Sequence, residues 1–281
     1  MATLETTIRL GDDLTVHRLG FGAMRITGDG VWGPPKDPVE AKLLLRRAIS
    51  LGVDLIDTAD SYGPEFSEQL IAEALHPYPA DLVIATKGGF VRPGPGRWQA
   101  DGRPAHLKEA CEGSLRRLRL ERIDLYQLHA VDDRVPFEDS VGALAELRSA
   151  GKIREVGLSN VSAAQLKQAR SIVPIVSVQN RYNLADRSSE SVLTACDRDG
   201  LAFIPWFPLG AGALVNRRGT LARVAARHQA TTSQVALAWL LQHSAVMLPI
   251  PGTSSITHLE ENMGAAELRL GPDEIRSLGS D

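Results

Sequence analysis

The segment Val53-Asp-Leu-Ile-Asp-Thr-Ala59 is a short apolar, β-branched run, and a second one, Asp81-Leu-Val-Ile-Ala-Thr-Lys87, follows after a helical pattern. Continuous apolar runs that alternate with amphipathic segments predict a parallel sheet whose outer face is covered by helices. The alternation extends along the whole chain. Strands are expected at residues 18–23, 53–59, 81–87, 123–129, 153–159, 175–180, 202–206 and 246–250. Helices are expected at residues 39–51, 68–75, 105–118, 137–150, 163–172, 190–199 and 233–243.

Eight such units favour closure of the sheet into a barrel, and about 250 residues is the usual length of a (β/α)8 barrel. We therefore predict an α/β protein, a (β/α)8 TIM barrel that forms one domain over residues 1–281. Ile8–Leu10 and Leu14–Val16 flank Gly11-Asp12 and predict a β-hairpin ahead of the barrel. Extra helices are expected late in the chain, at residues 220–228 and 272–278.

Composition excludes several functional classes. The chain has 281 residues, 43% hydrophobic and 23% charged, with a net charge of −3. This balance gives no basic stripe for nucleic acid. Residues 1–7 lack the pattern of a secretory signal, and the longest apolar stretch, 235–241, is too short to span a bilayer. The two cysteines, Cys111 and Cys196, have no metal-like spacing and are expected to be free thiols. We expect a cytoplasmic protein without a metal site, and the oligomeric state stays open.

One dinucleotide-binding motif can be set aside. Gly20-Phe-Gly22-Ala-Met-Arg25 begins like a GxGxxG loop, but its sixth position is Arg and a Gly/Pro-rich loop follows. The Rossmann fingerprint requires a turn that opens directly into a helix, whose N-terminus holds the pyrophosphate. The segment therefore does not predict a Rossmann site.

Ionisable side chains gather at the ends of consecutive strands. Asp57, Lys87 and His129 each end a predicted strand, and Tyr62 follows shortly after the first of them in Asp57-Thr-Ala-Asp-Ser-Tyr62-Gly63. Active sites of (β/α)8 barrels lie at the carboxyl ends of the strands. Taken singly, Asp57 and Lys87 could be a structural ion pair and His129 a buried structural histidine. The four together, in this order, favour a catalytic site.

In order and strand context, these four residues resemble the catalytic tetrad of the aldo-keto reductases. The resemblance implies that Tyr62 donates the proton when a carbonyl is reduced by hydride transfer. Lys87 would favour the phenolate and lower the pKa of Tyr62, and Asp57 would hold Lys87 charged and oriented. His129, as a neutral donor, would polarise the carbonyl oxygen.

The cofactor elements also resemble those of the family. Gly157-Leu-Ser159-Asn160 and Gln179 match the residues that hold the nicotinamide amide, and Trp206 matches the aromatic that stacks on its ring. Read singly, Trp206 could be a core aromatic and Ser159-Asn160 a helix cap. The resemblance implies the cofactor-binding residues Gly22, Ala23, Met24, Ser159, Asn160, Gln179, Trp206, Phe207, Leu209, Gly210, Gly252, Thr253, Ser254, His258, Glu261 and Asn262.

The adenosine end departs from the family pattern. Thr253 and Ser254 match its 2′-phosphate region, and Glu261 and Asn262 match its adenine contacts. Where many members carry Lys and Arg, this chain has Gly252 and His258. A histidine carries only part of a positive charge at neutral pH. NADP(H) is therefore expected ahead of NAD(H), by a narrower margin than in relatives with Arg.

The substrate is expected to be a small carbonyl compound. Within the family the sequence resembles bacterial pyridoxal reductases, notably in Gly30-Val-Trp-Gly-Pro-Pro35 and Ile250-Pro-Gly-Thr-Ser-Ser255. Trp32 and Trp98 are expected on the loops after the first and third strands, where two indoles could enclose a flat aromatic aldehyde. They could equally pack against their own loops.

Two other functions fit the same residues. The first is an NAD-linked alcohol dehydrogenase of this fold, because the tetrad serves both directions of the reaction. The second is a nucleotide-binding regulatory subunit without significant turnover, since some aldo-keto-like proteins report redox state to channels. The intact tetrad favours an NAD(P)H-dependent enzyme.

Overall fold

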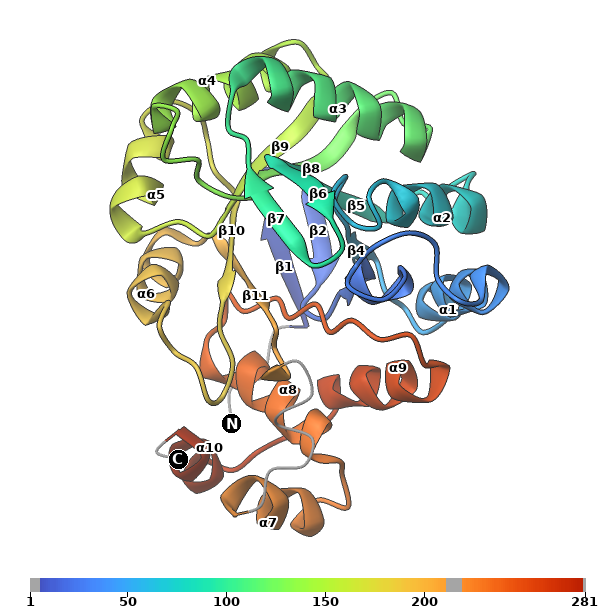
Figure 1. Ribbon diagram of the computed structural model, residues 1–281. Helices are drawn as coiled ribbons and strands as arrows, with labels where there is room; N and C mark the ends of the chain where they lie inside the picture. The colour runs from blue at the N-terminus through green and yellow to red at the C-terminus, as the bar shows by residue number, and fades with distance from the viewer. Residues whose placement is uncertain (1–5, 211–218, 280–281) are drawn as a thin grey trace.

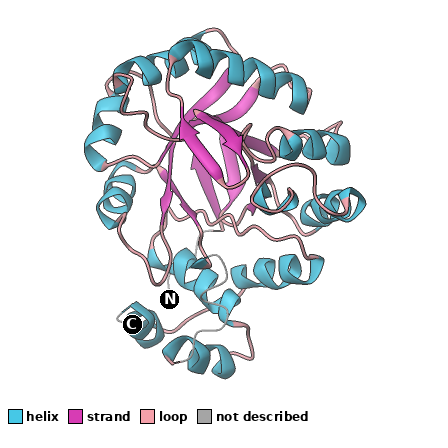
Figure 2. Ribbon diagram, in the orientation of Figure 1, coloured by secondary structure: helices cyan, strands magenta, loops and turns pink. Residues whose placement is uncertain are grey.

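The protein is described by a computed structural model that covers residues 6–210 and 219–279. Its centre is a parallel sheet of seven strands, curled on itself and ringed by helices (Figures 1 and 2). The strands follow one another in chain order: β3 (Phe21–Gly22), β4 (Leu55–Asp57), β5 (Val83–Gly88), β8 (Ile123–Leu128), β9 (Ile153–Ser159), β10 (Ser177–Arg181) and β11 (Ala202–Trp206). The predicted α/β barrel class is confirmed.

The eighth predicted strand, at residues 246–250, is not a regular strand, and this corrects the prediction. The segment still lies between β11 and β3. Phe203 N donates to Val246 O (2.8 Å) and Leu248 N to Phe203 O (2.9 Å), while Gly20 N donates to Pro249 O (3.0 Å). Proline has no N–H to donate, so Pro249 and Pro251 leave the join to β3 incomplete. These bonds close the barrel without forming a ladder.

In the described part of the chain, eight helices cover the outside of the barrel, and four of them begin at a capping side chain. Asp37 caps the first helix ahead of Pro38, and Thr231 and Gln234 form a reciprocal capping box that starts α8. The helices are α1 (Pro38–Ser50), α2 (Phe66–Leu75), α3 (Pro104–Leu118), α4 (Phe137–Ser149), α5 (Ala163–Arg170), α6 (Glu190–Asp199), α8 (Thr232–His243) and α9 (Ile256–Met263). The expected helix bounds hold within a few residues.

The N-terminal hairpin fills one end of the barrel. Strands β1 (Thr7–Leu10) and β2 (Leu14–His17) pair antiparallel, with Ile8 opposite Val16, as predicted. Leu10, Leu14 and Val16 share an apolar cluster with the inward side chains of β4, β5, β8 and β11. The hairpin therefore closes the end of the barrel opposite the carboxyl ends of the strands.

The two extra helices predicted late in the chain are present as α7 (Thr220–Arg227) and α10 (Pro272–Gly279). Glu274 joins them, because its carboxylate accepts from Arg227 Nη1 at 2.7 Å and lies 2.9 Å from His228 Nε2. Trp239 Nε1 of α8 donates to Ile275 O at 3.2 Å. A short 3-10 turn, η3 (Gly264–Ala266), lies between α9 and α10.

Two loops at the mouth of the barrel have more structure than predicted. The stretch after β3 begins with a 3-10 turn, η1 (Ala23–Ile26), before the Gly/Pro-rich loop. The stretch after β5, expected to be a loop, holds a hairpin of β6 (Phe90–Gly94) and β7 (Arg97–Ala100), with a register shift between Val91 and Gly94. The prolines at 93 and 95 hide its alternating pattern in the sequence.

Both cysteines are buried free thiols, Cys111 on α3 and Cys196 on α6. Over the described part of the chain, no helix has the length and apolar character that crossing a membrane requires. Within the same residues, no group of three or more His, Cys, Asp or Glu side chains is placed to hold a metal ion.

Candidate active site

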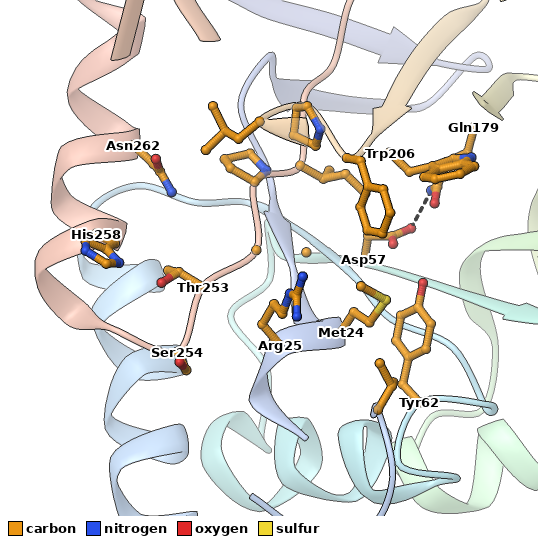
Figure 3. A pocket seen from close by; sticks show the side chains of 18 of the residues that line it. Met24, Arg25, Asp57, Tyr62, Gln179, Trp206, Thr253, Ser254, His258 and Asn262 are labelled. Carbon is orange, nitrogen blue, oxygen red and sulfur yellow. Dashed lines mark hydrogen bonds between the residues drawn. The ribbon is translucent and has the colours of Figure 1, made fainter. Parts of the chain in front are cut away.

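A cavity of about 1240 Å³ opens at the carboxyl ends of the strands. One end is lined by Asp57 and Tyr62, and the other by Thr253, Ser254 and Asn262 (Figure 3). His129 lines the first end, with its ring centroid 5.7 Å from that of Tyr62. The first group comes from β4, the loop after it and the residue that follows β8. In the second group, Thr253 and Ser254 lie in the segment that leads into α9, and Asn262 lies on α9 itself. The structure thus brings both predicted groups into one elongated cavity.

Lys87 and Asp57 form a buried ion pair beneath the first end. Lys87 Nζ lies 2.6 Å from Asp57 Oδ1, and the two side chains are 0% and 2% exposed. The ammonium also donates to Thr58 O at 2.8 Å and to Tyr62 Oη at 3.4 Å. Burial tends to lower the pKa of Lys87, but Asp57 and Tyr62 outweigh it and the pKa is raised. Lys87 is therefore a fixed cation that contacts Tyr62 from behind the cavity wall.

Two glutamines hold the second oxygen of Asp57. Gln127 Nε2 donates to Asp57 Oδ2 at 3.0 Å and Gln179 Nε2 to the same atom at 2.9 Å (Figure 3). Sequence reasoning missed Gln127. A signal existed, because residues two apart in a strand share a face, and Gln127 stands two residues before His129. The carboxylate is fully satisfied, so its orientation toward Lys87 is set.

Tyr62 is poised as an acid. Burial raises the pKa of its hydroxyl, and the opposing pull of Lys87 only partly offsets that rise. The predicted direction of the Lys87 effect is correct, but the net direction of the pKa change is upward. The hydroxyl therefore stays protonated at neutral pH and has a proton to give.

His129 is neutral. Burial, followed by the positive charges of Lys87 and Arg92, places the pKa of His129 well below its usual range. Its backbone is fixed on both sides, since His129 N donates to Gly88 O at 2.9 Å and Asn160 Nδ2 donates to His129 O at 3.0 Å. Ser61 Oγ lies 3.3 Å from Nδ1 of the ring. A neutral imidazole can offer one N–H to a ligand in the cavity.

The β6–β7 hairpin supplies an aromatic wall beside this end. Phe90 packs edge-on against His129 at 4.7 Å between ring centroids, and Trp98 packs against Tyr62 at 6.2 Å. The Arg92 guanidinium lies 3.7 Å from the centre of the Trp98 ring. Its nitrogens also donate to four carbonyl oxygens, those of Gly30, Val31, Ser61 and Arg97. One cation thus ties the hairpin to two neighbouring loops.

Trp32 does not line the cavity, contrary to expectation, whereas Trp98 does. Trp32 pairs through its backbone with Gly63, and its ring lies 5.7 Å from the Arg92 guanidinium. This is the loop-packing role that the sequence left open for it. Phe90, which sequence reasoning missed, takes the second place in the aromatic wall because the hairpin turns it inward.

The predicted amide-binding residues line the cavity beside Asp57 and His129. Asn160 Oδ1 accepts from Trp206 Nε1 at 3.0 Å, which fixes the indole, and Ser159 Oγ donates to Gln179 O at 2.8 Å. Asn160 has a positive φ of 57°, a conformation that asparagine tolerates better than most residues. Phe207 and Leu209 line the cavity beside Trp206.

Two of the predicted cofactor-binding residues do not line the cavity. Ala23 is fully buried in a core cluster with Phe21 and Ile26. Gly210 closes a turn instead, with φ of 59° and its N donating to Phe207 O at 2.9 Å. The remaining predicted residues, Gly22, Met24, Ser159, Asn160, Gln179, Trp206, Phe207, Leu209, Gly252, Thr253, Ser254, His258, Glu261 and Asn262, all line it.

The far end explains why this chain has glycine at position 252. A Cβ on Gly252 would lie 2.6 Å from Gly22 O, and one on Gly22 would lie 2.6 Å from Ile250 O. Both distances are far inside van der Waals contact, so the two backbones approach as closely as they do only because both residues are glycines. A lysine at this position would force the segments apart.

Arg25 brings a positive charge to this end that sequence reasoning missed. It lines the cavity from η1, and its Cγ lies 3.6 Å from the position of a Cβ on Gly252. In Figure 3 its guanidinium lies between Met24 and Thr253. The discarded GxGxxG motif hid this role, since Arg25 is the residue that breaks the motif.

Comparison with known proteins agrees with this geometry. The sequence pattern of the Aldo/keto reductase family matches residues 18–280. An uncharacterised oxidoreductase of Schizosaccharomyces pombe is 48% identical over 275 residues, which cover 98% of this chain and 89% of that protein. Pyridoxine 4-dehydrogenase of Escherichia coli is 46% identical over 270 residues, 94% of each chain.

A solved structure adds a comparison in three dimensions. The aldo-keto reductase of Klebsiella pneumoniae in complex with NADPH superposes with a TM-score of 0.83 at 29% identity, covering 99% of this chain and 95% of that one. The chain therefore belongs to the aldo/keto reductase family and is an oxidoreductase that uses a nicotinamide cofactor.

Proposed function

We propose that this enzyme reduces the carbonyl group of an aldehyde or ketone with NADPH and that Tyr62 donates the proton. One observation carries the proposal: the Tyr62 hydroxyl faces the cavity while Lys87 Nζ contacts it from behind at 3.4 Å. General acids contribute on the order of 100- to 10,000-fold to such reactions. A buried tyrosine beside a fixed cation suits that role in the reducing direction.

The chemistry of the two ends of the cavity suits a nicotinamide dinucleotide. Ser159, Asn160 and Gln179 would hold the carboxamide, and Trp206 would stack on the nicotinamide ring. Glu261 and Asn262 would bind the adenine edge. When bound, the cofactor supplies the hydride. What the protein supplies is the orientation, the proton and the exclusion of water.

The proton moves from Tyr62 Oη to the oxygen of the former carbonyl. His129 is neutral and donates a hydrogen bond to the same oxygen, which stabilises the charge that develops there. Lys87 stabilises the phenolate left on Tyr62, and Asp57 keeps Lys87 in place. In the oxidising direction Tyr62 would take the proton back, so the same four residues serve a dehydrogenase.

The preference for NADPH over NADH rests on the far end of the cavity. Arg25, Thr253 and Ser254 would meet the 2′-phosphate, together with the N-terminus of α9, which Ser255 caps by accepting from His258 N. Arginine is charged at every working pH. Arg25 therefore brings a permanent positive charge to this end of the cavity.

The aromatic wall favours a flat, aromatic aldehyde as substrate. Phe90, Trp98 and Val31 line the cavity beside Tyr62 and His129, and such walls bind planar rings through edge and face contacts. Because the Escherichia coli relative is a pyridoxine 4-dehydrogenase, pyridoxal and pyridoxine form the first pair to test.

The decisive experiment is a panel of aldehydes and ketones, pyridoxal included, with NADPH and with NADH, followed by the absorbance of the cofactor. Pyridoxine and simple alcohols with the oxidised cofactors test the reverse direction. We expect reduction of aromatic aldehydes with NADPH. Tight NADPH binding without turnover of any compound would contradict the proposal and favour a regulatory nucleotide-binding role.

A further inference from the structure

Ser61 is a buried serine whose position the tetrad does not explain. It lies in the loop between Asp57 and Tyr62 and is 2% exposed. Its hydroxyl oxygen lies 3.3 Å from His129 Nδ1, and its carbonyl oxygen accepts from Arg92 Nη1 at 2.8 Å. Arg92 thereby fixes the backbone that presents the hydroxyl to the ring.

The contact at Nδ1 decides what His129 can do in the cavity. A neutral imidazole carries one N–H, and the other nitrogen accepts. If Ser61 donates to Nδ1, the proton of the ring is on Nε2, the nitrogen left to meet a ligand. If Nδ1 instead donates to Ser61, Nε2 is an acceptor and cannot polarise a carbonyl oxygen.

We infer that Ser61 is a positioning residue that donates its hydroxyl proton to His129 Nδ1 and so holds the ring in the Nε2–H form that a carbonyl substrate requires. The inference rests on the proposed function, since it assigns how His129 becomes a donor. Ser61 touches neither the substrate nor the cofactor and acts only through His129.

The surroundings of Ser61 support this direction of donation. The neighbouring carboxyl is that of Asp60, whose Oδ1 is buried without a hydrogen bond among the described residues. Burial, and then the charge of Glu68, raise the pKa of Asp60 to about 8, against the opposing effects of Arg117 and Ser61. The Ser61 hydroxyl is also hydrogen-bonded to the Asp60 carboxyl. At neutral pH Asp60 keeps its own proton and can donate it to the Ser61 oxygen, which leaves the hydroxyl proton of Ser61 for His129 Nδ1.

Packing around the His129 ring disfavours rotation toward another hydrogen-bond partner. Phe90, Tyr62 and Trp98 pack edge-on against it, with centroid distances of 4.7, 5.7 and 6.2 Å. Burial, and then the charges of Lys87 and Arg92, lower the pKa of His129 and disfavour a second proton on the ring. The packing sets the orientation of the imidazole, and Ser61 sets which nitrogen carries the proton.

The tautomer can be measured in the cofactor-free protein. Long-range nitrogen–proton correlation spectra of protein labelled at the histidine rings distinguish Nε2–H from Nδ1–H, and the His129→Asn spectrum assigns the signal. We expect the Nε2–H form in wild type at neutral pH and a mixture of tautomers in Ser61→Ala. Ser61→Thr, which keeps the hydroxyl, should retain the wild-type form.

The same variants also test the inference by enzyme kinetics. Ser61→Ala should lower kcat for aldehyde reduction by about 2- to 12-fold, the equivalent of one neutral hydrogen bond, with the KM for NADPH unchanged. Ser140→Ala is the matched control, because Ser140 is also buried but bonds to Gly102 O, away from the site. It should change neither the tautomer nor kcat.

Two results would overturn the inference: an Nδ1–H tautomer in wild type, or a Ser61→Ala protein with the wild-type tautomer and kcat. If Ser61→Ala does not fold, the wild-type and Ser61→Thr spectra still decide. Failure of the proposed function is a separate result, since it would leave the enzyme without turnover while the tautomer of the free protein remained as described.

Discussion

The two ends of the cavity are built in different ways. At the Tyr62 end, Asp57, Lys87 and His129 are almost fully buried, and each is held by hydrogen bonds or packed rings. At the far end, Ser254 and His258 are exposed, and Arg25 reaches in from the surface. A buried polar network is costly to disturb, whereas exposed charges contribute little individually. We therefore expect large effects on rate at the first end and graded effects on affinity at the second.

Tyr62→Phe tests this contrast most strongly. Loss of the hydroxyl should lower kcat for aldehyde reduction by on the order of 100- to 10,000-fold, with NADPH affinity nearly intact by fluorescence titration. Tyr78→Phe is the control, because the Tyr78 hydroxyl donates to Leu118 O and Tyr78 does not line the cavity. Turnover of Tyr62→Phe within a few-fold of wild type would remove Tyr62 from the mechanism.

The buried pair beneath Tyr62 should rank next. Lys87→Met should reduce kcat nearly as much as Tyr62→Phe, because Lys87 contacts the acid directly, and Asp57→Asn should be milder, because Asp57 acts through Lys87. Each variant leaves one buried charge without its partner, which typically costs about 3–5 kcal/mol of stability. Thermal unfolding must therefore be measured beside kcat. A much larger kcat loss in a folded Asp57→Asn than in Lys87→Met would reverse the assigned roles.

Substitutions at the far end should change affinity and leave kcat alone. Arg25→Gln should weaken NADPH binding by about tenfold, the lower end of what a hydrogen bond to a charged group contributes, with little effect on NADH. His258→Arg should widen the NADPH preference. Arg46→Gln, on the outer face of α1 where it bonds to Ala74 O, is the control. Equal titration curves for both cofactors in all variants would favour the NAD-linked alternative.

The smallest expected effect separates the two tryptophans at the mouth. Trp98→Leu should raise KM for aromatic aldehydes by about 2- to 12-fold, in keeping with the strength of an aromatic contact, and should affect aliphatic aldehydes less. Trp32→Leu should leave both KM values near wild type, because Trp32 does not line the cavity. Equal effects of the two substitutions would mean that the loops move together rather than that Trp98 contacts the substrate.

The barrel could be predicted because strands that are covered by helices require apolar side chains. Such apolar runs are visible in the sequence at residues 53–59 and 81–87. The sequence overstated the eighth strand because hydropathy does not register the missing N–H groups of Pro249 and Pro251. Prolines also explain why the β6–β7 hairpin was not predicted. Prolines interrupt its alternating pattern, although its pairing leaves them outside the bonded positions.

Sequence order predicted that Asp57, Tyr62, Lys87 and His129 lie together, because the ends of parallel strands meet at one edge of the sheet whatever the conformation of the loops. Arg25 and Phe90 could not be found in that way. The position of each of these side chains depends on the conformation of a loop. A single sequence contains no pattern from which the conformation of η1 or of the β6–β7 hairpin can be predicted. The absence of Lys at position 252 is explained only by the close approach of Gly22.

The incomplete join between β3 and residues 246–251 determines the register in which this segment lies against its neighbouring strands. Val246 and Leu248 direct their backbone polar groups toward Phe203, whereas Pro249 and Pro251 present only carbonyls, which accept from Gly20 and Gly22. A slip of the segment by one residue would turn a proline toward β11 and remove the donor that Leu248 gives to Phe203 O. The two prolines therefore permit a single register. Because residues 252–262 follow directly, that register also fixes how far Thr253 and Asn262 stand from Tyr62.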